Sequence, residues 1–255
     1  MREQKRTSNN KKRYGTKRGS GRGLLLLPVV IVLIAAAFLL LNNVFVVRNV
    51  IVGGDAALTE TDVARLSGLR FGTSIFRIDA EEIRQNVESS GEYILEEIRV
   101  QRPNSVYLSI NRRLAVAVVF SGGQYLSLDE RAVVVRIEEK SSQEELVFVK
   151  GMNPVNYRLG RPIAVSSDQS TAYTALMSSM MRQDALPLIK EIDFSDLMHI
   201  RGMSSIGVSV EFGDAENIED KIVWMKAALL DLAARGDTVG LLDVSSGTQA
   251  QWRAA

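Results

Sequence analysis

Few residues of the types that most often carry out chemistry occur in this sequence, and none stands in a recognisable catalytic or metal-binding pattern. His199 is the only histidine and the chain has no cysteine, so a metal centre or a histidine-activated nucleophile has no support. Neighbouring carboxylates occur at Glu81–Glu82, Glu96–Glu97 and Glu144–Glu145. Catalytic carboxylates must converge in a cleft, whereas these adjacent residues indicate solvated charge. The sequence therefore predicts no catalytic residue, no cofactor and no metal, which leaves binding as the expected function.

The end of the chain is the candidate for that binding. Val239–Val244 is an apolar run with β-favouring residues, and Ser245–Gly247 is typical of a turn. In the segment 248–253, Thr248, Ala250 and Trp252 alternate with the polar residues between them. This alternation predicts a strand with one apolar and one polar face. Such a strand can offer its backbone edge to a partner. The alternative is a purely structural strand whose Ala250 and Trp252 cover the helix expected at 214–235.

A membrane anchor is predicted near the start of the chain. Leu24–Leu41 contains no charged residue, and 18 residues of helix extend about 27 Å, close to the roughly 30 Å of a hydrocarbon core. A cleaved signal peptide would have a small-residue site followed by polar sequence, but here Ala35–Ala37 is followed by further Phe and Leu. A buried soluble helix would not be apolar all round. We therefore expect a single transmembrane helix at 24–44.

Charge is divided unevenly on the two sides of this helix. Residues 1–23 hold nine Lys and Arg and one Glu, a net of +8, and the remaining residues hold 22 against 29, a net of −7. Since basic flanks stay in the cytoplasm, we expect residues 1–23 to form a disordered basic cytoplasmic tail. Binding of nucleic acid or anionic lipid is an alternative role for this tail, and no nucleic acid partner is predicted.

The rest of the chain is predicted to fold as an α+β protein with two modules outside the membrane. Residues 45–114 show the order β-α-α-β-β, with a first strand at 45–52, capped helices opening at Thr59 and Asp79, and a brief extended link at 75–78. Residues 115–255 are expected to form a mixed β-rich domain with packed helices. Its strands are expected at 116–120, 125–128, 132–137, 146–150, 188–194, 198–202 and 206–212. Its helices are expected at 167–182 and 214–235, with Ser167 and Asp214 as their caps.

In this order of elements the sequence resembles the FtsQ/DivIB family of bacterial cell-division proteins, from Arg13 to Trp252. The stretch VRNVIVGGDAALTETDVARLSGLRFGTSIFRIDAEEIRQNV resembles the family's POTRA domain, and GLLDVSSGTQAQW resembles its closing hairpin. The family's small, capping and apolar POTRA positions correspond here to Gly53, Thr59, Val63, Gly72, Phe76, Asp79 and Ile83. Lys221 stands where the family has a lysine. One departure is Asn111 and Leu114 at the POTRA exit, where the family usually has an acid and a proline.

The resemblance implies a non-enzymatic divisome scaffold at the cell membrane and division septum. Its implied partners are FtsL-like and FtsB/DivIC-like single-pass proteins, and its implied role is to place septal peptidoglycan synthesis. The family's partner site is a sheet edge to which a partner strand is added. Carried over by position, that site corresponds to Leu241, Asp243, Ser246, Thr248, Gln249, Gln251 and Trp252.

A second hypothesis is a membrane-anchored envelope enzyme or cell-wall-polymer-binding protein with an unrecognised site in the β domain. A buried cluster of converging titratable groups would favour this hypothesis. A shallow surface with a free sheet edge would favour the scaffold.

Overall fold

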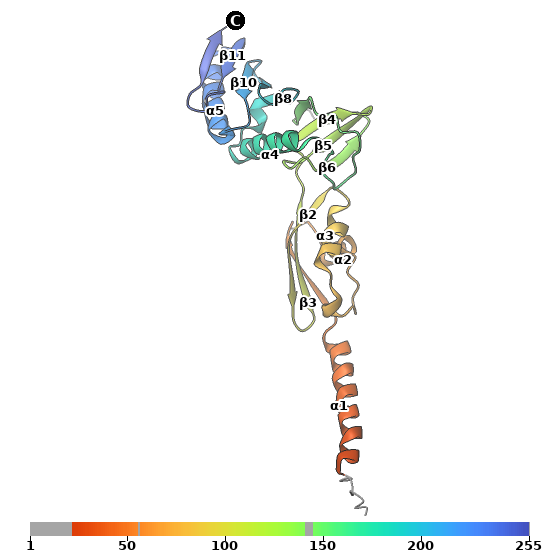
Figure 1. Ribbon diagram of the computed structural model, residues 1–255. Helices are drawn as coiled ribbons and strands as arrows, with labels where there is room; N and C mark the ends of the chain where they lie inside the picture. Colours follow the sequence, from red (N-terminus) through yellow and green to blue (C-terminus); the bar gives the residue numbers. More distant parts are fainter. Residues whose placement is uncertain (1–21, 56, 141–144, 255) are drawn as a thin grey trace, which may run out of the picture.

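The chain folds into a long helix followed by two sheet-containing units (Figure 1). A computed structural model describes residues 22–55, 57–140 and 145–254, with the side chains of residues 22–27 and 40–42 left out. The helices are α1 (Arg22–Val44), α2 (Glu60–Ser67), α3 (Ala80–Glu88), α4 (Ser167–Arg182) and α5 (Ile218–Arg235), with 3-10 turns η1 (Ile75–Arg77) and η2 (Leu186–Leu188). The strands are β1 (Asn49–Gly54), β2 (Tyr93–Gln101), β3 (Ser105–Arg112), β4 (Ala117–Ser121), β5 (Gln124–Leu128), β6 (Val134–Glu138), β7 (Val147–Lys150), β8 (Ile189–Asp193), β9 (Ile200–Ser204), β10 (Ser209–Gly213), β11 (Gly240–Asp243) and β12 (Gln251–Ala254).

The N-terminal unit, β1 to β3 with α2 and α3, has a three-stranded sheet in the order β1-β3-β2. β1 pairs with β3 in parallel, and β2 pairs with β3 in antiparallel orientation. The two helices begin at strong caps, since Thr59 and Asp62 form a capping box and the Asp79 carboxylate accepts two backbone N–H groups. Val63, Ile83 and Val87 bury one helix face against Leu95, Val106, Leu108 and Ile110 of the sheet. The predicted β-α-α-β-β order is therefore present.

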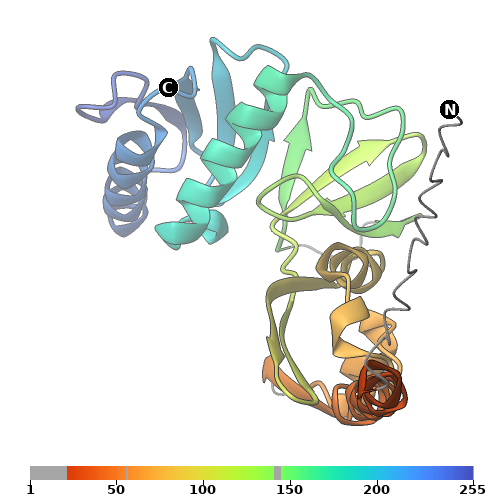
Figure 2. The same cartoon turned by 60° about the horizontal axis from the view of Figure 1, so that its bottom comes forward.

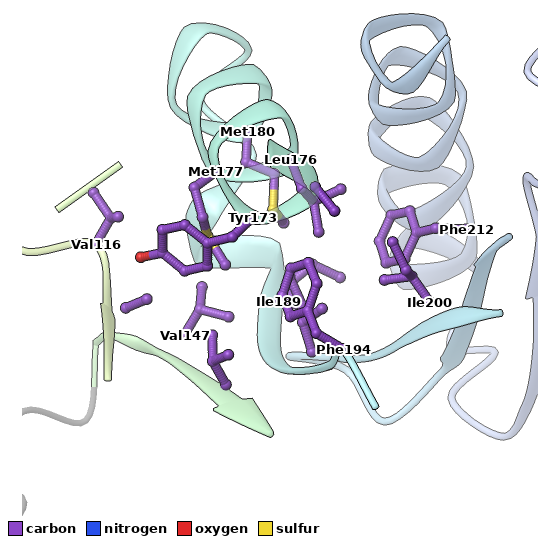
Figure 3. Close-up of a cluster of buried hydrophobic side chains, with 14 of the residues drawn as sticks. Val116, Val147, Tyr173, Leu176, Met177, Met180, Ile189, Phe194, Ile200 and Phe212 are labelled. Atoms are coloured by element: carbon purple, nitrogen blue, oxygen red, sulfur yellow. The ribbon is translucent and has the colours of Figure 1, made fainter. Parts of the chain in front are cut away.

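The C-terminal unit, β4 to β12 with α4 and α5, is built on one nine-stranded mixed sheet. Its strand order is β12-β11-β10-β9-β8-β7-β4-β5-β6. Helices α4 and α5 lie over the sheet and contact each other (Figure 2). In Figure 3, Tyr173, Leu176, Met177 and Met180 of α4 extend toward Val147, Ile189 and Phe194 below them. Together with apolar residues of α5 they make the main core of the unit.

The two units meet at a closely packed junction. A Cβ atom on Gly160 would overlap the carbonyl oxygen of Glu88, and one on Gly91 would lie 2.8 Å from the carbonyl oxygen of Val134. At the end of β3, the buried Arg113 forms an ion pair with the equally buried Asp129, and its Nη2 lies 3.9 Å from Glu88 Oε2. The atypical Leu114 is exposed in the short connection to β4. Backbone contacts and a buried ion pair thus couple the units.

Several element boundaries differ from those expected. The first strand begins at Asn49 rather than Phe45, because Phe45 and Val47 bond instead to the backbone of the 72–75 loop. The segment 75–78, expected to be extended, contains the 3-10 turn η1. Ser166, not Ser167, caps α4. Helix α5 starts at Ile218 with Asn217 as N-cap, and the Asp214 carboxylate accepts the Glu216 N–H and the Lys221 ammonium group in the turn before the helix.

The helix α1 covers the predicted membrane segment at 24–44. Its side chains at residues 29–34, 38 and 39 are large, apolar and about half or more exposed. Among the residues whose side chains the structure describes, no helix is long and apolar enough to cross a membrane. Residues 24–27 and 40–42 of the predicted span lie outside those residues, as does the predicted tail up to residue 21.

Candidate partner-binding edge

The last two strands form an antiparallel hairpin at one end of the nine-stranded sheet. Residues 240–243 of β11 pair in register with residues 254–251 of β12, so that Leu242 faces Trp252 and Asp243 faces Gln251. On its other side β11 pairs in parallel with β10, whereas β12 has no second neighbour in the described part of the chain. The outer backbone row of β12 is consequently available for hydrogen bonds to another strand.

Trp252 anchors β12 to the sheet. Its half-buried ring packs on the edge of the main core and lies across Gly240, where a Cβ atom would come within 2.8 Å of Trp252 Cζ2. Only glycine fits at residue 240 for this reason. The exposed side chains of Gln251 and Arg253 alternate with Trp252 and lie on the solvent side of the hairpin.

The turn before β12 is held against the start of α5 and against β10. Gly247 has φ of +69° and stands close to the Lys221 side-chain stem and Asn217, where a Cβ would make ordinary contacts at 3.5–3.7 Å. Lys221 is buried, and its ammonium group donates to the Asp214 carboxylate at 2.8 Å and to the Asp214 carbonyl at 3.0 Å. The backbone N–H of Val244 donates to the Glu211 carbonyl. The turn is thereby positioned by groups that the sequence separates by more than twenty residues.

Asp243 is the acidic residue of the hairpin. The Ser245 hydroxyl donates to its carboxylate at 2.7 Å and the Ser245 backbone N–H donates at 3.1 Å. These hydrogen bonds, with the Arg253 guanidinium 3.8 Å away, hold the pKa of Asp243 below its ordinary value. The carboxylate therefore stays charged at neutral pH and closes the turn.

The residues carried over as the partner site lie close together at the end of the sheet but differ in exposure. Leu241, Asp243 and Trp252 are half-buried in the two paired strands, and Gln251 is exposed in β12. Ser246, Thr248 and Gln249 are exposed in the connection. The expected strand at 248–253 is shorter and shifted, because the Thr248 backbone bonds to the Ser246 hydroxyl and continues the turn.

Two residues of the hairpin were missed by the site prediction. Arg253 is exposed on β12 and reaches Asp243, and its place in the polar-apolar alternation would have indicated it. Gly240 makes room for the Trp252 ring, and nothing in its immediate sequence signals that contact.

The opposite edge of the sheet differs from β12 because it is already occupied along part of its length. The Val134 N–H donates to the Arg161 carbonyl, the Gly160 N–H donates to the Val134 carbonyl, and the Ile163 N–H donates to the Ala132 carbonyl. The segment 160–163 thus covers the start of β6, whereas nothing described covers β12.

The other candidate chemical groups are dispersed. His199 is exposed before β9, with Nδ1 3.6 Å from Glu211 Oε1. Glu81–Glu82 and Glu96–Glu97 are exposed on α3 and β2, and Glu144 lies outside the described residues. In the ranges that the structure describes, no cluster of three or more His, Cys, Asp or Glu residues could hold a metal ion.

Comparison with known proteins adds to this geometry. Residues 45–113 match the family model of the FtsQ-type POTRA domain. The chain is 22% identical to cell division protein DivIB of Clostridium acetobutylicum over 178 residues, which is 70% of this chain and 71% of that protein. It is 21% identical to cell division protein DivIB of Clostridium tetani over 204 residues, 79% of this chain and 76% of that protein. Both findings support the FtsQ/DivIB family of cell-division proteins.

The family model covers the N-terminal unit. The FtsQ-type POTRA match ends at residue 113, which is the buried arginine of the junction. The DivIB similarity covers more residues than this match.

Proposed function

We propose that this chain is a membrane-anchored scaffold of the bacterial cell-division machinery. In this proposal its extracytoplasmic units bind FtsL-like and FtsB/DivIC-like single-pass proteins at the division septum and help to place septal peptidoglycan synthesis. The FtsQ-type POTRA match and the similarity to two DivIB cell division proteins support the division role. The binding mode is inferred from the two edges of the nine-stranded sheet: the edge at β12 is open, whereas the start of β6 at the opposite edge is covered.

Strand addition fits the chemistry of that edge. A partner strand alongside β12 would satisfy its outer N–H and C=O groups, and main-chain bonds would supply affinity without a deep pocket. The exposed polar side chains of Gln251 and Arg253 would lie beside side chains of the partner strand on the same face of the sheet, while Trp252 packs β12 on the core. Ser246, Thr248 and Gln249 would lie near one end of the added strand, and Leu241 and Asp243 one strand further in.

Anchoring by α1 is the second part of the proposal. Leu24–Leu41 has no charged residue, and the described apolar side chains of α1 have large exposed fractions. Those side chains would lose their unfavourable contact with water inside a lipid bilayer. The basic residues before α1 favour a cytoplasmic N-terminus.

The enzyme alternative has one structural feature to consider, a buried polar cluster in the C-terminal unit. Asp129 accepts backbone N–H bonds from Arg131 and Val133 and pairs with Arg113. The Tyr173 hydroxyl donates to the Asp129 carbonyl at 2.8 Å, and burial raises the pKa of Tyr173 well above its ordinary value. Because these groups are engaged with one another and with the backbone, the cluster serves as a structural brace, which favours the scaffold.

A direct test is affinity capture of the detergent-solubilised full chain by purified FtsL-like and DivIC-like partners. Removal of residues 251–255 is expected to reduce partner affinity at least about tenfold, since most main-chain bonds of an added strand would be lost. Circular dichroism and thermal unfolding verify that the shortened chain is folded. Equal binding by a folded shortened chain would contradict the proposed site. A matched control is Lys190→Ala, an exposed change on the interior strand β8.

A further inference from the structure

A surface of the N-terminal unit next to α1 carries exposed aromatic and basic side chains together. Three segments form this surface, residues 45–49, 70–78 and 101–105. We call it the proximal pole. It contains four arginines and no acidic residue. Its exposed aromatic and basic members are Arg48, Arg70, Phe71, Phe76, Arg77 and Arg102.

Backbone hydrogen bonds hold the three segments side by side. The Ile75 N–H donates to the Phe45 carbonyl, the Val47 N–H donates to the Thr73 carbonyl, and the Arg48 N–H donates to the Asn104 carbonyl. In Figure 1, the turn between β2 and β3 is at the end of the N-terminal unit that lies next to α1. The backbone of the proximal pole is therefore held in place by hydrogen bonds between its three segments.

The pole is also fixed to the end of α1. Helix α1 ends at Val44, and the next residue, Phe45, already packs its ring against Phe76 with centroids 5.5 Å apart. The Arg48 guanidinium donates to the Asn43 carbonyl in the last turn of α1 at 2.9 Å. No flexible linker separates the helix from the pole, so a bilayer around α1 would have its surface at the pole.

The side chains of the pole have the chemistry of a membrane interface. Phe71 and Phe76 are each nearly 60% exposed, which is unusual for large aromatic residues on a soluble surface. Arg102 lies over the Phe76 ring at 5.8 Å. In the described ranges none of the four arginines forms an ion pair, although Asp79 and Glu82 line the neighbouring hollow with Arg70 and Arg77. Aromatic rings together with guanidinium groups that form no ion pair suit the boundary between acyl chains and anionic headgroups.

We propose that the proximal pole binds the headgroup layer of an anionic phospholipid bilayer, with Phe71 and Phe76 inserted and the arginines on lipid phosphates. This inference rests on the proposed anchoring by α1. Binding at the pole would fix the orientation of the N-terminal unit relative to the membrane, because a unit held at both α1 and the pole cannot rotate freely about residue 45. The partner edge at β12 would then be kept at a defined distance from the membrane.

The absence of cysteine allows a clean test. Single Phe71→Cys and Phe76→Cys variants of the full chain carry a nitroxide label, and Val155→Cys, an exposed residue after β7, is the control. Each is reconstituted in vesicles of phosphatidylcholine alone or mixed with phosphatidylglycerol, and label depth is measured by collision with oxygen and a water-soluble nickel chelate. Labels at 71 and 76 are expected to be shielded from nickel in the anionic vesicles, and the label at 155 to remain exposed.

Charge variants separate specific contact from simple proximity. Arg70→Gln or Arg77→Gln is expected to lower the ratio of lipid-contacting to water-exposed label about fivefold each, whereas Arg65→Gln, an exposed arginine of α2 outside the pole, should not change it. Carbonate extraction reports anchoring separately. An extracted chain would overturn the anchor and this inference together, and an anchored chain with labels as exposed as the control would overturn the inference alone.

Discussion

At the residue scale, the most consequential interaction is the buried ion pair between Arg113 and Asp129. Both side chains are at least 95% buried, and Arg113 Nε has no hydrogen-bond partner among the described atoms. Removing one member of a buried pair leaves the other charge without its partner, which is costly. The pair also links the last residue of the N-terminal unit to the turn after β5.

Arg113→Ala is expected to lower the free energy of unfolding by about 3 to 5 kcal/mol, because Asp129 would remain buried and charged. Urea unfolding followed by the fluorescence of Trp224 and Trp252, both in the C-terminal unit, measures the change. The neighbouring Arg112→Ala is the control, since Arg112 is exposed and 3.9 Å from Asp55, and it should cost less than about 1 kcal/mol. Similar losses for both variants would show that the buried pair has no special role.

The lowered pKa values of Asp243 and Asp214 predict how the stability of the folded state depends on pH. Hydrogen bonds from Ser245 and from Lys221, respectively, lower their pKa values in the folded state. A lowered pKa stabilises the folded state fully above the unfolded pKa of about 3.9, and this contribution disappears as pH falls through the folded pKa. Acid should therefore loosen the turn and the start of α5.

Asp243→Asn tests this directly. The variant should be less stable than the original chain at about pH 7, and the difference should shrink at a second pH below the lowered folded pKa, where Asp243 itself is neutral. Urea unfolding at the two pH values gives both differences. A difference that stays constant between the two conditions would contradict the assigned role of the charge.

At the scale of elements, the local signals in the sequence were strong wherever a helix carries its own caps. Thr59 with Asp62, and Asp79, mark the starts of α2 and α3 in sequence and in structure. At α5 the sequence signal placed the start of the helix too early. Asp214 has the residue type of an N-cap, but its carboxylate accepts the Glu216 N–H and the Lys221 ammonium group in the preceding turn, and Asn217 takes the cap position with φ of +51°.

Thr59→Ala should destabilise α2 by about 0.5 to 2 kcal/mol through loss of the capping box. Amide hydrogen exchange in residues 60–67 should then quicken about threefold to thirtyfold if exchange follows local opening. Thr61→Ala, an exposed change inside the helix, should leave the rates nearly unchanged. Slower exchange than in the original chain, or equal acceleration by both changes, would refute the capping role.

The sequence predicted the closing strand of the candidate site but not the place of that strand in the sheet. Alternation after residue 248 indicated a closing strand, and β12 is found at residues 251–254. The sequence did not indicate that β12 is the last strand of nine, because strand order depends on crossovers between distant segments. Nor did it indicate the cover at residues 160–163, which distinguishes the two ends of the sheet.

At the scale of the whole molecule, the chain separates an apolar helix at one end from an open sheet edge at the other. The coupled junction at Arg113, Gly91 and Gly160 transmits the orientation of the N-terminal unit to the nine-stranded sheet. In Figure 1, β11 and the C-terminus lie at the end of the molecule opposite α1. A scaffold of this form would present a strand-accepting edge away from the membrane that anchors it.

Cysteine cross-linking can detect a division partner whose strand is added along β12. Single cysteines at Gln251, Arg253 and the interior-strand control Lys190 are introduced into the cysteine-free full chain and paired with a cysteine scan of the DivIC-like partner. Cross-links are predicted from residues 251 and 253, at every second partner residue, and not from residue 190. A bound partner that cross-links equally from residue 190, or never from the edge, would contradict the account.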